Sequence, residues 1–139
     1  MPTSSSILQK FLSNSLSFGK STKLALVVRS DIKMSKGKTA AQCAHAAVMC
    51  YQGSEQGTKL QKAILQRWCR LGQPKIVLRV DNFEQLSSLE RQAQEANVVA
   101  AMVRDAGRTQ LESGTATVLG LGPAPAEDLD KLVAHLKLL

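Results

Sequence analysis

Histidine, cysteine and aromatic residues are scarce in this sequence, and their scarcity narrows the kinds of site that it can form. The chain contains two histidines, His45 and His135, and three cysteines, none of them in a C-x-x-C pair. Zinc sites are built from several such ligands at short spacings, so the sequence predicts no metal site. Aromatic residues make up only 4% of the chain, which disfavours a protein that binds nucleic acid by stacking exposed rings on the bases.

The cysteines indicate the redox compartment of the protein, and the apolar runs argue against a membrane-spanning helix. Cys43 and Cys50 are seven residues apart in a segment that we interpret as helical, too far for a disulfide between them. With Cys69 the three cannot all pair, which indicates a reducing compartment and thiols that pack as small apolar groups. Every apolar run is far shorter than the about 20 residues that a membrane-spanning helix needs.

Acidic residues are nearly absent from the first fifty residues, whereas basic residues are frequent there. This part holds seven Lys or Arg residues against Asp31 alone, so it carries +6 of the formal net charge of +7. From Tyr51 onward the two signs nearly balance. A basic region attracts polyanions, of which nucleic acid and anionic membranes are the usual candidates. Many soluble proteins are equally basic without binding RNA, so charge alone does not decide the function.

Residues 1–22 differ in composition from the rest of the chain. They are rich in serine, contain Lys10 and Lys20 but no acid, and include a weak amphipathic pattern of apolar residues. Mitochondrial transit sequences have this composition, and so do flexible leaders. The remaining residues, 23–139, fit one domain. We therefore expect a leader or targeting remnant followed by a single domain, in the cytoplasm or the mitochondrion.

Short apolar runs alternate with helical patterns after the leader. The expected strands are residues 24–28, 75–80, 98–103 and 115–121. The expected helices are residues 38–51, 54–71, 82–96 and 125–137, with Asp81 as an N-cap and with Leu60, Ile64, Trp68 and Leu71 facing the core. Strands interleaved with helices predict a sheet covered on both faces, a three-layer α/β/α fold. The direct connection between the last two strands indicates that the four-stranded sheet is mixed.

Polar residues of the segment 36–46 fall on one face of the first expected helix. At 100° per residue, Lys38, Gln42 and His45 lie within about 60° of one another. The rest of this helix is rich in alanine, which lets it lie close to a neighbouring backbone. Its polar face is either an ordinary solvent-exposed surface or part of a binding or catalytic site. Lys36 and Lys38 also lie at the helix N-terminus, where free N–H groups and the helix dipole favour a phosphate or a developing oxyanion.

A second group of polar residues, 105–110, follows the third expected strand. Binding and catalytic groups of α/β proteins tend to lie in loops that leave strand ends. Asp105, Arg108 and Thr109 would there supply an acid or base, a phosphate clamp and an orienting hydroxyl. The alternative is a polar turn in which Asp105 caps local N–H groups.

Three stretches together resemble the type 2 peptidyl-tRNA hydrolases of archaea and eukaryotes: KLALVVRSDIKMSKGKTAAQCAHAAV, GQPKIVL and RDAGRTQLESGTATVLGLGPAPAEDLDKLVAHLKLL. The resemblance covers residues 23–139. It implies hydrolysis of the ester between peptide and tRNA, a mixed four-stranded sheet between helices, no metal or organic cofactor, and often a homodimer. It also implies an active site lined by Lys38, Gln42, His45, Asp105, Thr109 and Thr117.

This resemblance suggests a mechanism in which Lys38 and Asp105 lie close together as an ion pair. Asp105, through Thr109, would orient or deprotonate the attacking water. Lys38, with N–H groups at the start of its helix, would stabilise the negative charge that develops on oxygen.

The remaining residues would bind and place the substrate. Gln42 and Thr117 would position it, and His45 would assist or support. The candidates for binding tRNA phosphates are Lys33, Lys36, Arg104 and Arg108. Two other classes of function stay open on the same fold: a non-catalytic RNA-binding module and a mitochondrial protein-interaction adaptor.

Overall fold

The centre of the structure is a pair of antiparallel strands, β1 (Thr22–Arg29) and β4 (Ala116–Pro125). Every residue of β4 is buried, and so is most of β1. Side chains of a strand point alternately to its two faces, so a strand covered on both faces needs continuous apolar sequence. The computed structural model describes residues 21–107 and 111–139.

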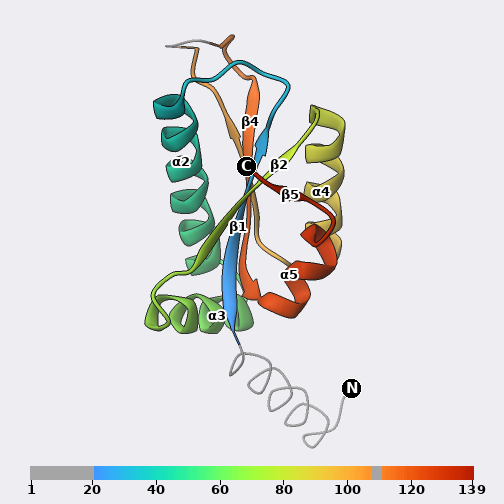
Figure 1. The fold of residues 1–139 in the computed structure, drawn as a ribbon. Helices are drawn as coiled ribbons and strands as arrows, with labels where there is room; N and C mark the ends of the chain where they lie inside the picture. Colours follow the sequence, from blue (N-terminus) through green and yellow to red (C-terminus); the bar gives the residue numbers. More distant parts are fainter. Residues whose placement is uncertain (1–20, 108–110) are drawn as a thin grey trace, which may run out of the picture.

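Three further strands complete a five-stranded sheet with the order β3-β4-β1-β2-β5 (Figure 1). β2 (Lys75–Val80) pairs parallel with β1, and β3 (Ala100–Arg104) pairs antiparallel with β4. The predicted mixed sheet is therefore confirmed. Its strand count was one too low, because β5 (Lys137–Leu138) adds at the free edge of β2. Lys137 was assigned to the last turn of the closing helix, which stops earlier, at Val133.

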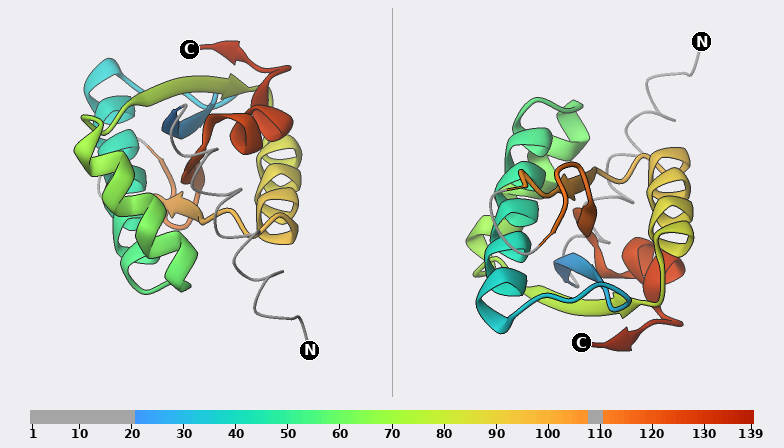
Figure 2. Two further views of the ribbon diagram at one scale, coloured as in Figure 1. Left: turned by 90° about the horizontal axis from the view of Figure 1, so that it is seen from below. Right: turned by 90° about the horizontal axis from the view of Figure 1, so that it is seen from above.

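Helices cover both faces of this sheet, as the predicted three-layer α/β/α fold requires. They are α2 (Lys36–Glu55), α3 (Lys59–Arg70), α4 (Phe83–Glu95) and α5 (Ala126–Val133). α2 and α3 share one apolar cluster with the sheet, whereas α4 and α5 share the cluster on the opposite face. Figure 2 shows these two layers on either side of the strands.

The helix boundaries differ from those predicted, most of all between α2 and α3. α2 continues to Glu55, and α3 starts after Thr58, whose side chain forms a capping box with Gln61. α4 is capped by Asn82, whose side chain accepts a hydrogen bond from the Gln85 N–H at 2.9 Å, and not by Asp81. Asx and Thr side chains compete for such positions within a few residues, so pattern alone locates a cap only approximately.

The later start of α3 changes which of its residues reach the core. Ile64 and Trp68 are buried as predicted. Leu60 and Leu71 were expected beside them, but this prediction is wrong, since they are 41% and 46% exposed. Leu60 lies in the first turn of α3, and Leu71 follows its last residue.

α2 lies close to β4 at Gly120. A Cβ atom on Gly120 would lie 2.6 Å from the Cys50 sulfur and 3.1 Å from the Ala46 carbonyl oxygen, closer than side chains normally approach. The close approach predicted from the alanine-rich sequence of α2 is thus confirmed. Because α2 is held this near to β4, its N-terminal turns lie over the start of β4 and the end of β3.

We expect Gly120→Ala to lower the free energy of unfolding by about 1–3 kcal/mol, because the new methyl group must push α2 away from β4. Gly37→Ala is the matched control, since a Cβ at Gly37 meets nothing within 4 Å. The control should leave stability unchanged or slightly raised, because alanine is the better helix former. Urea unfolding curves measure both effects, and equal stability of the two variants would contradict the packing argument.

Candidate functional site

The expected ion pair between Lys38 and Asp105 is confirmed. Lys38 lies in the first turn of α2, and Asp105 directly follows β3. Their side chains are joined by a salt bridge and are only 11% and 1% exposed. A charge removed from water to this degree needs a partner, because an uncompensated buried charge costs several kcal/mol. Each of the two charges is therefore compensated by the other in this position.

The chain around Lys38 holds the start of α2 in a defined place. Ser35 is the N-cap, and its side-chain oxygen accepts a hydrogen bond from the Lys38 N–H at 3.1 Å. The Ser35 carbonyl oxygen accepts a second bond, from the Thr39 hydroxyl at 2.9 Å. The cap of α2 thus helps to fix the turn that carries Lys38.

Backbone hydrogen bonds fix Asp105 at the neck of the loop between β3 and β4. Its N–H donates to the Thr115 carbonyl at 2.8 Å, and its carbonyl accepts from the Gly114 N–H at 2.7 Å. The carboxylate oxygen Oδ2 accepts from the Gly107 N–H at 2.8 Å. Gly107 has φ +77°, and a Cβ there would lie 2.8 Å from that of Ser113, so the turn requires glycine.

The polar turn predicted at Asp105 is present, and so is the expected contact between Asp105 and Lys38. One carboxylate oxygen caps the local N–H group of Gly107, as a polar turn would require. The other contacts the ammonium of Lys38. The local bond orients the carboxylate, and the ion pair ties the loop to α2.

A second polar pair, Gln42 and Thr117, lies one helical turn further along α2. The Thr117 hydroxyl donates to Gln42 Oε1 at 2.5 Å, and the two residues are 0% and 5% exposed. Buried polar groups without such a partner would cost about 1–3 kcal/mol. The bond joins α2 to the start of β4, next to the place where the ion pair joins α2 to the end of β3.

The other predicted site residues lie on the surface or outside the described residues. His45 is exposed on α2 and takes no part in either of the two polar pairs. Lys33 and Lys36 are exposed around the start of the same helix. Arg104 is exposed at the end of β3, where it donates to the Gly114 carbonyl at 3.1 Å. The predictions for Arg108 and Thr109 fall outside the described residues.

Arg29 and Asp31 belong to the same end of the sheet, although the sequence analysis did not propose them. Arg29 donates to both carboxylate oxygens of Asp31, at 3.0 and 2.9 Å, and to the Ala116 carbonyl at 3.1 Å. It thereby links the end of β1 to the start of β4, beside Thr117. The hydrogen bond from Arg29 holds the pKa of Asp31 below its ordinary value. The position of both residues just after a buried strand could have identified them.

The cysteines are free thiols, as expected. Burial raises the pKa of the Cys50 thiol to about 12, so it packs against β4 as a neutral group. Within residues 21–107 and 111–139, no three His, Cys, Asp or Glu side chains gather in a way that would hold a metal ion. In the same residues, no helix combines the length and the apolar character needed to cross a membrane.

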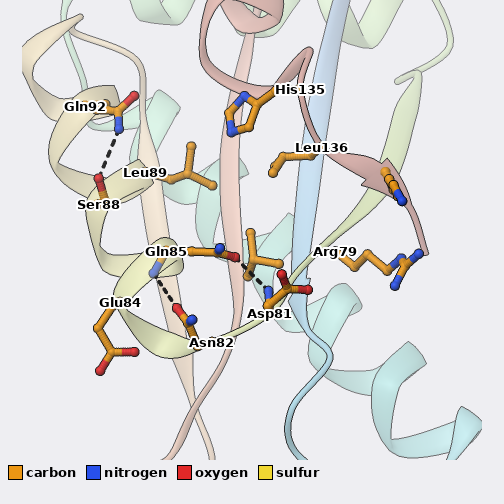
Figure 3. Close-up of a pocket in the computed structure, with 12 residues that line it drawn as sticks. Arg79, Asp81, Asn82, Glu84, Gln85, Ser88, Leu89, Gln92, His135 and Leu136 are labelled. Carbon is orange, nitrogen blue, oxygen red and sulfur yellow. Dashed lines mark hydrogen bonds between the residues drawn. The ribbon is translucent and has the colours of Figure 1, made fainter.

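A cleft of about 580 Å³ lies away from these pairs, between α4 and the segment that joins α5 to β5 (Figure 3). Gln85 of α4 and Arg79 of β2 lie on opposite sides of it, with Asp81 between them and His135 above in this view. Gln85 is occupied in accepting a hydrogen bond from the Asp81 N–H at 2.8 Å. None of the predicted catalytic residues lines this cleft, so the buried polar pairs remain the candidate site.

Comparison with models of protein families shows to which family the chain belongs. Residues 22–139 match the family model described as Peptidyl-tRNA hydrolase PTH2. The match covers the whole described fold from β1 onward, including Lys38 and Asp105. The chain therefore belongs to this family of peptidyl-tRNA hydrolases.

Individual relatives are similar over the same region. Peptidyl-tRNA hydrolase 2, mitochondrial, of Mus musculus is 45% identical over 116 residues, which are 84% of this chain and 62% of the relative. The Homo sapiens protein of the same name is 46% identical over 116 residues, 84% of this chain and 63% of the relative. The peptidyl-tRNA hydrolase of Sulfurisphaera tokodaii is 45% identical over 119 residues, 85% of this chain and 98% of the relative. The chain thus spans about three fifths of its mammalian relatives and nearly all of the archaeal one.

We expect Asp31→Asn to destabilise the fold only where Asp31 is charged. Its folded pKa lies below the ordinary value of 3.8, so the pair stabilises the protein above that pH and loses the effect as pH falls through the lower folded value. At neutral pH the loss should be at most about 1 kcal/mol, because the pair is partly exposed. Unfolding curves of wild type and Asp31→Asn at neutral pH and well below pH 3.8 measure this difference in the free energy of unfolding. A loss of equal size at both would mean that the pairing is not electrostatic.

Proposed function

We propose that this chain hydrolyses the ester bond between the peptide and the 3′ end of the tRNA in peptidyl-tRNA. The observation that carries the proposal is the buried ion pair of Lys38 and Asp105 at the N-terminus of α2, in a chain that belongs to the family. The archaeal relative, of which the chain covers 98%, is named peptidyl-tRNA hydrolase. The described fold therefore corresponds to a whole relative that bears the activity in its name.

In the proposed reaction, water attacks the ester carbonyl carbon and the bond to the ribose oxygen breaks. Asp105 accepts the proton of the attacking water, with Thr109 orienting that water. Lys38 and the N–H groups at the start of α2 stabilise the oxyanion of the tetrahedral intermediate. The proton then passes to the ribose oxygen, which leaves as a hydroxyl of tRNA. The peptide leaves as a carboxylic acid, which releases the second proton of the water to solvent. The scheme uses only water and side chains of this chain.

Gln42 and Thr117 act beside this centre by positioning it. Their mutual hydrogen bond is buried and joins α2 to the start of β4. In the proposal this bond keeps the ion pair in place for the substrate. The two residues would thus place the substrate indirectly, because they fix the position of α2. His45 has a supporting role on the exposed side of the same helix.

The tRNA phosphates near the ester would be bound by basic residues around the site. Lys33, Lys36 and Arg104 are exposed there, and Arg108 is the fourth candidate. Such contacts displace counterions from the phosphates, so the affinity for tRNA falls as salt rises. A Michaelis constant that does not change with ionic strength would exclude this role.

The proposal also includes the division of the chain, its location and its assembly. Residues 1–22 act as a leader or targeting remnant and residues 23–139 as the hydrolase domain, in the cytoplasm or the mitochondrion. The two mammalian relatives are named as mitochondrial, and a fluorescent protein fused to residues 1–22 would show whether this segment directs import. A homodimer is supported by the family resemblance and by exposed apolar side chains on α2, Val48 and Met49. Light scattering over a range of concentrations tests it.

We expect Asp105→Ala to slow release of tRNA from an N-blocked aminoacyl-tRNA by about 10²–10⁴-fold, the usual contribution of a general base. Lys38→Ala should slow it by about 10²–10³-fold, the usual contribution of one oxyanion donor. Asp130→Ala is the matched control, because it breaks an exposed salt bridge with Lys23 far from the site. It should leave turnover unchanged.

Circular dichroism and thermal unfolding check that each variant is folded, since a lone buried charge destabilises. Unblocked aminoacyl-tRNA should survive with the wild-type enzyme. Turnover of both site variants within a few-fold of wild type would refute the mechanism. If folded wild-type protein cleaves nothing, the adaptor or RNA-binding function takes its place.

A further inference from the structure

The two helical layers of the molecule carry opposite charge. α2 and α3 together hold six basic residues and one acid, a net charge of +5. α4 and α5 together hold six acids and two basic residues, a net charge of −4. These layers lie on opposite faces of the sheet (Figure 2). A polyanion is therefore attracted to the α2–α3 side and repelled from the other.

Most of this positive charge belongs to α3, which contains four basic residues and no acid. Lys59, Lys62 and Arg70 are exposed, and at 100° per residue they fall within about 80° of one another on the helix. We call these three residues the α3 basic face. Lys62 and Arg70 also line a groove of about 540 Å³ between α3 and the last turns of α2.

The α3 basic face lies far from the ion pair but on the same side of the sheet. α2 joins the two places, since Lys38 lies in its first turn and α3 packs near its last turns (Figure 1). Twenty residues of helix span about 30 Å at 1.5 Å per residue. A substrate that reaches both places must therefore be long as well as negatively charged.

We propose that the α3 basic face is a second tRNA-binding surface, which contacts phosphates of the double-stranded part of the tRNA while the 3′ end lies at Lys38 and Asp105. The inference rests on the proposed function. Double-stranded RNA is bound mostly through its backbone and shape, and exposed lysine and arginine side chains suit this mode. The acidic α4–α5 layer keeps the tRNA on the correct side of the sheet.

An anionic membrane is the other polyanion that such a helix could meet. A helix that lies on a membrane buries an apolar face in the lipid. The apolar face of α3, Ile64, Leu65 and Trp68, is instead packed into the core against α2 and the sheet. Of the large apolar residues of α3 only Leu60 is exposed. One leucine among exposed charges is too little apolar surface to lie in lipid, which favours RNA.

The test is the double variant Lys62→Gln/Arg70→Gln, compared with Arg91→Gln/Lys131→Gln on the opposite layer, which removes the same charge. With N-blocked aminoacyl-tRNA, the α3 variant should raise KM by roughly tenfold and leave kcat unchanged. The slope of log KM against log salt should decrease by about 2, one for each lost phosphate contact. The control variant should not raise KM.

Three further measurements separate the possible outcomes. A short N-blocked aminoacyl oligonucleotide, which cannot reach α3, should be cleaved equally by wild type and the α3 variant. If wild type cleaves tRNA substrates but the α3 variant has the KM and salt slope of the control, the inference is wrong while the proposed function stands. If wild type cleaves nothing, the proposed function fails, and binding of uncharged tRNA to both variants still tests α3. Loss of binding to anionic vesicles with unchanged tRNA binding would assign the surface to membranes and overturn the inference.

Discussion

The close packing of α2 on β4 is the contact on which the candidate site depends. At Gly120 there is no room even for a methyl group between strand and helix. This contact holds the length of α2 against the sheet, so that its first two turns meet the end of β3 and the start of β4. Lys38 reaches Asp105 and Gln42 reaches Thr117 only because the helix lies at this depth. A helix pushed outward by an ångström would separate both pairs at once.

A buried ion pair such as Lys38 and Asp105 stabilises a fold poorly, so stability alone does not explain its presence. Removing Lys38 and Asp105 from water costs several kcal/mol per ion, and their attraction offsets this only with good geometry. Apolar residues of similar size would often give equal or greater stability. The pair therefore suits a chemical role, in which a carboxylate and an ammonium must be held ready at fixed positions without reorganisation. The loop that carries Asp105 follows the same principle, since its neck is closed by backbone bonds.

The distribution of charge connects this site to a large substrate. Counted along the chain, the positive charge is concentrated in the first fifty residues, and the rest is nearly neutral. This nearly neutral part contains helices of opposite charge, which the fold places on opposite faces of the sheet. Basic α3 packs beside α2, and acidic α4 and α5 pack on the other face. The electrostatic field thus agrees with the position of the ion pair. Both lie on the α2–α3 side, where the proposed tRNA substrate would bind.

The sequence by itself determined the order of the first four strands and of the helices, the alanine-rich helix that packs closely, and the two separate segments that carry Lys38 and Asp105. These features follow from periodicity and local composition, which are properties of short segments. Only the tertiary structure decided the two-residue strand β5, the burial of Gln42 with Thr117, and the pairing of Arg29 with Asp31 and the Ala116 carbonyl. Each of these depends on segments far apart in the chain that meet only in the folded sheet. The separation of charge between the layers has the same origin, because a linear count adds together helices that the fold places on opposite faces.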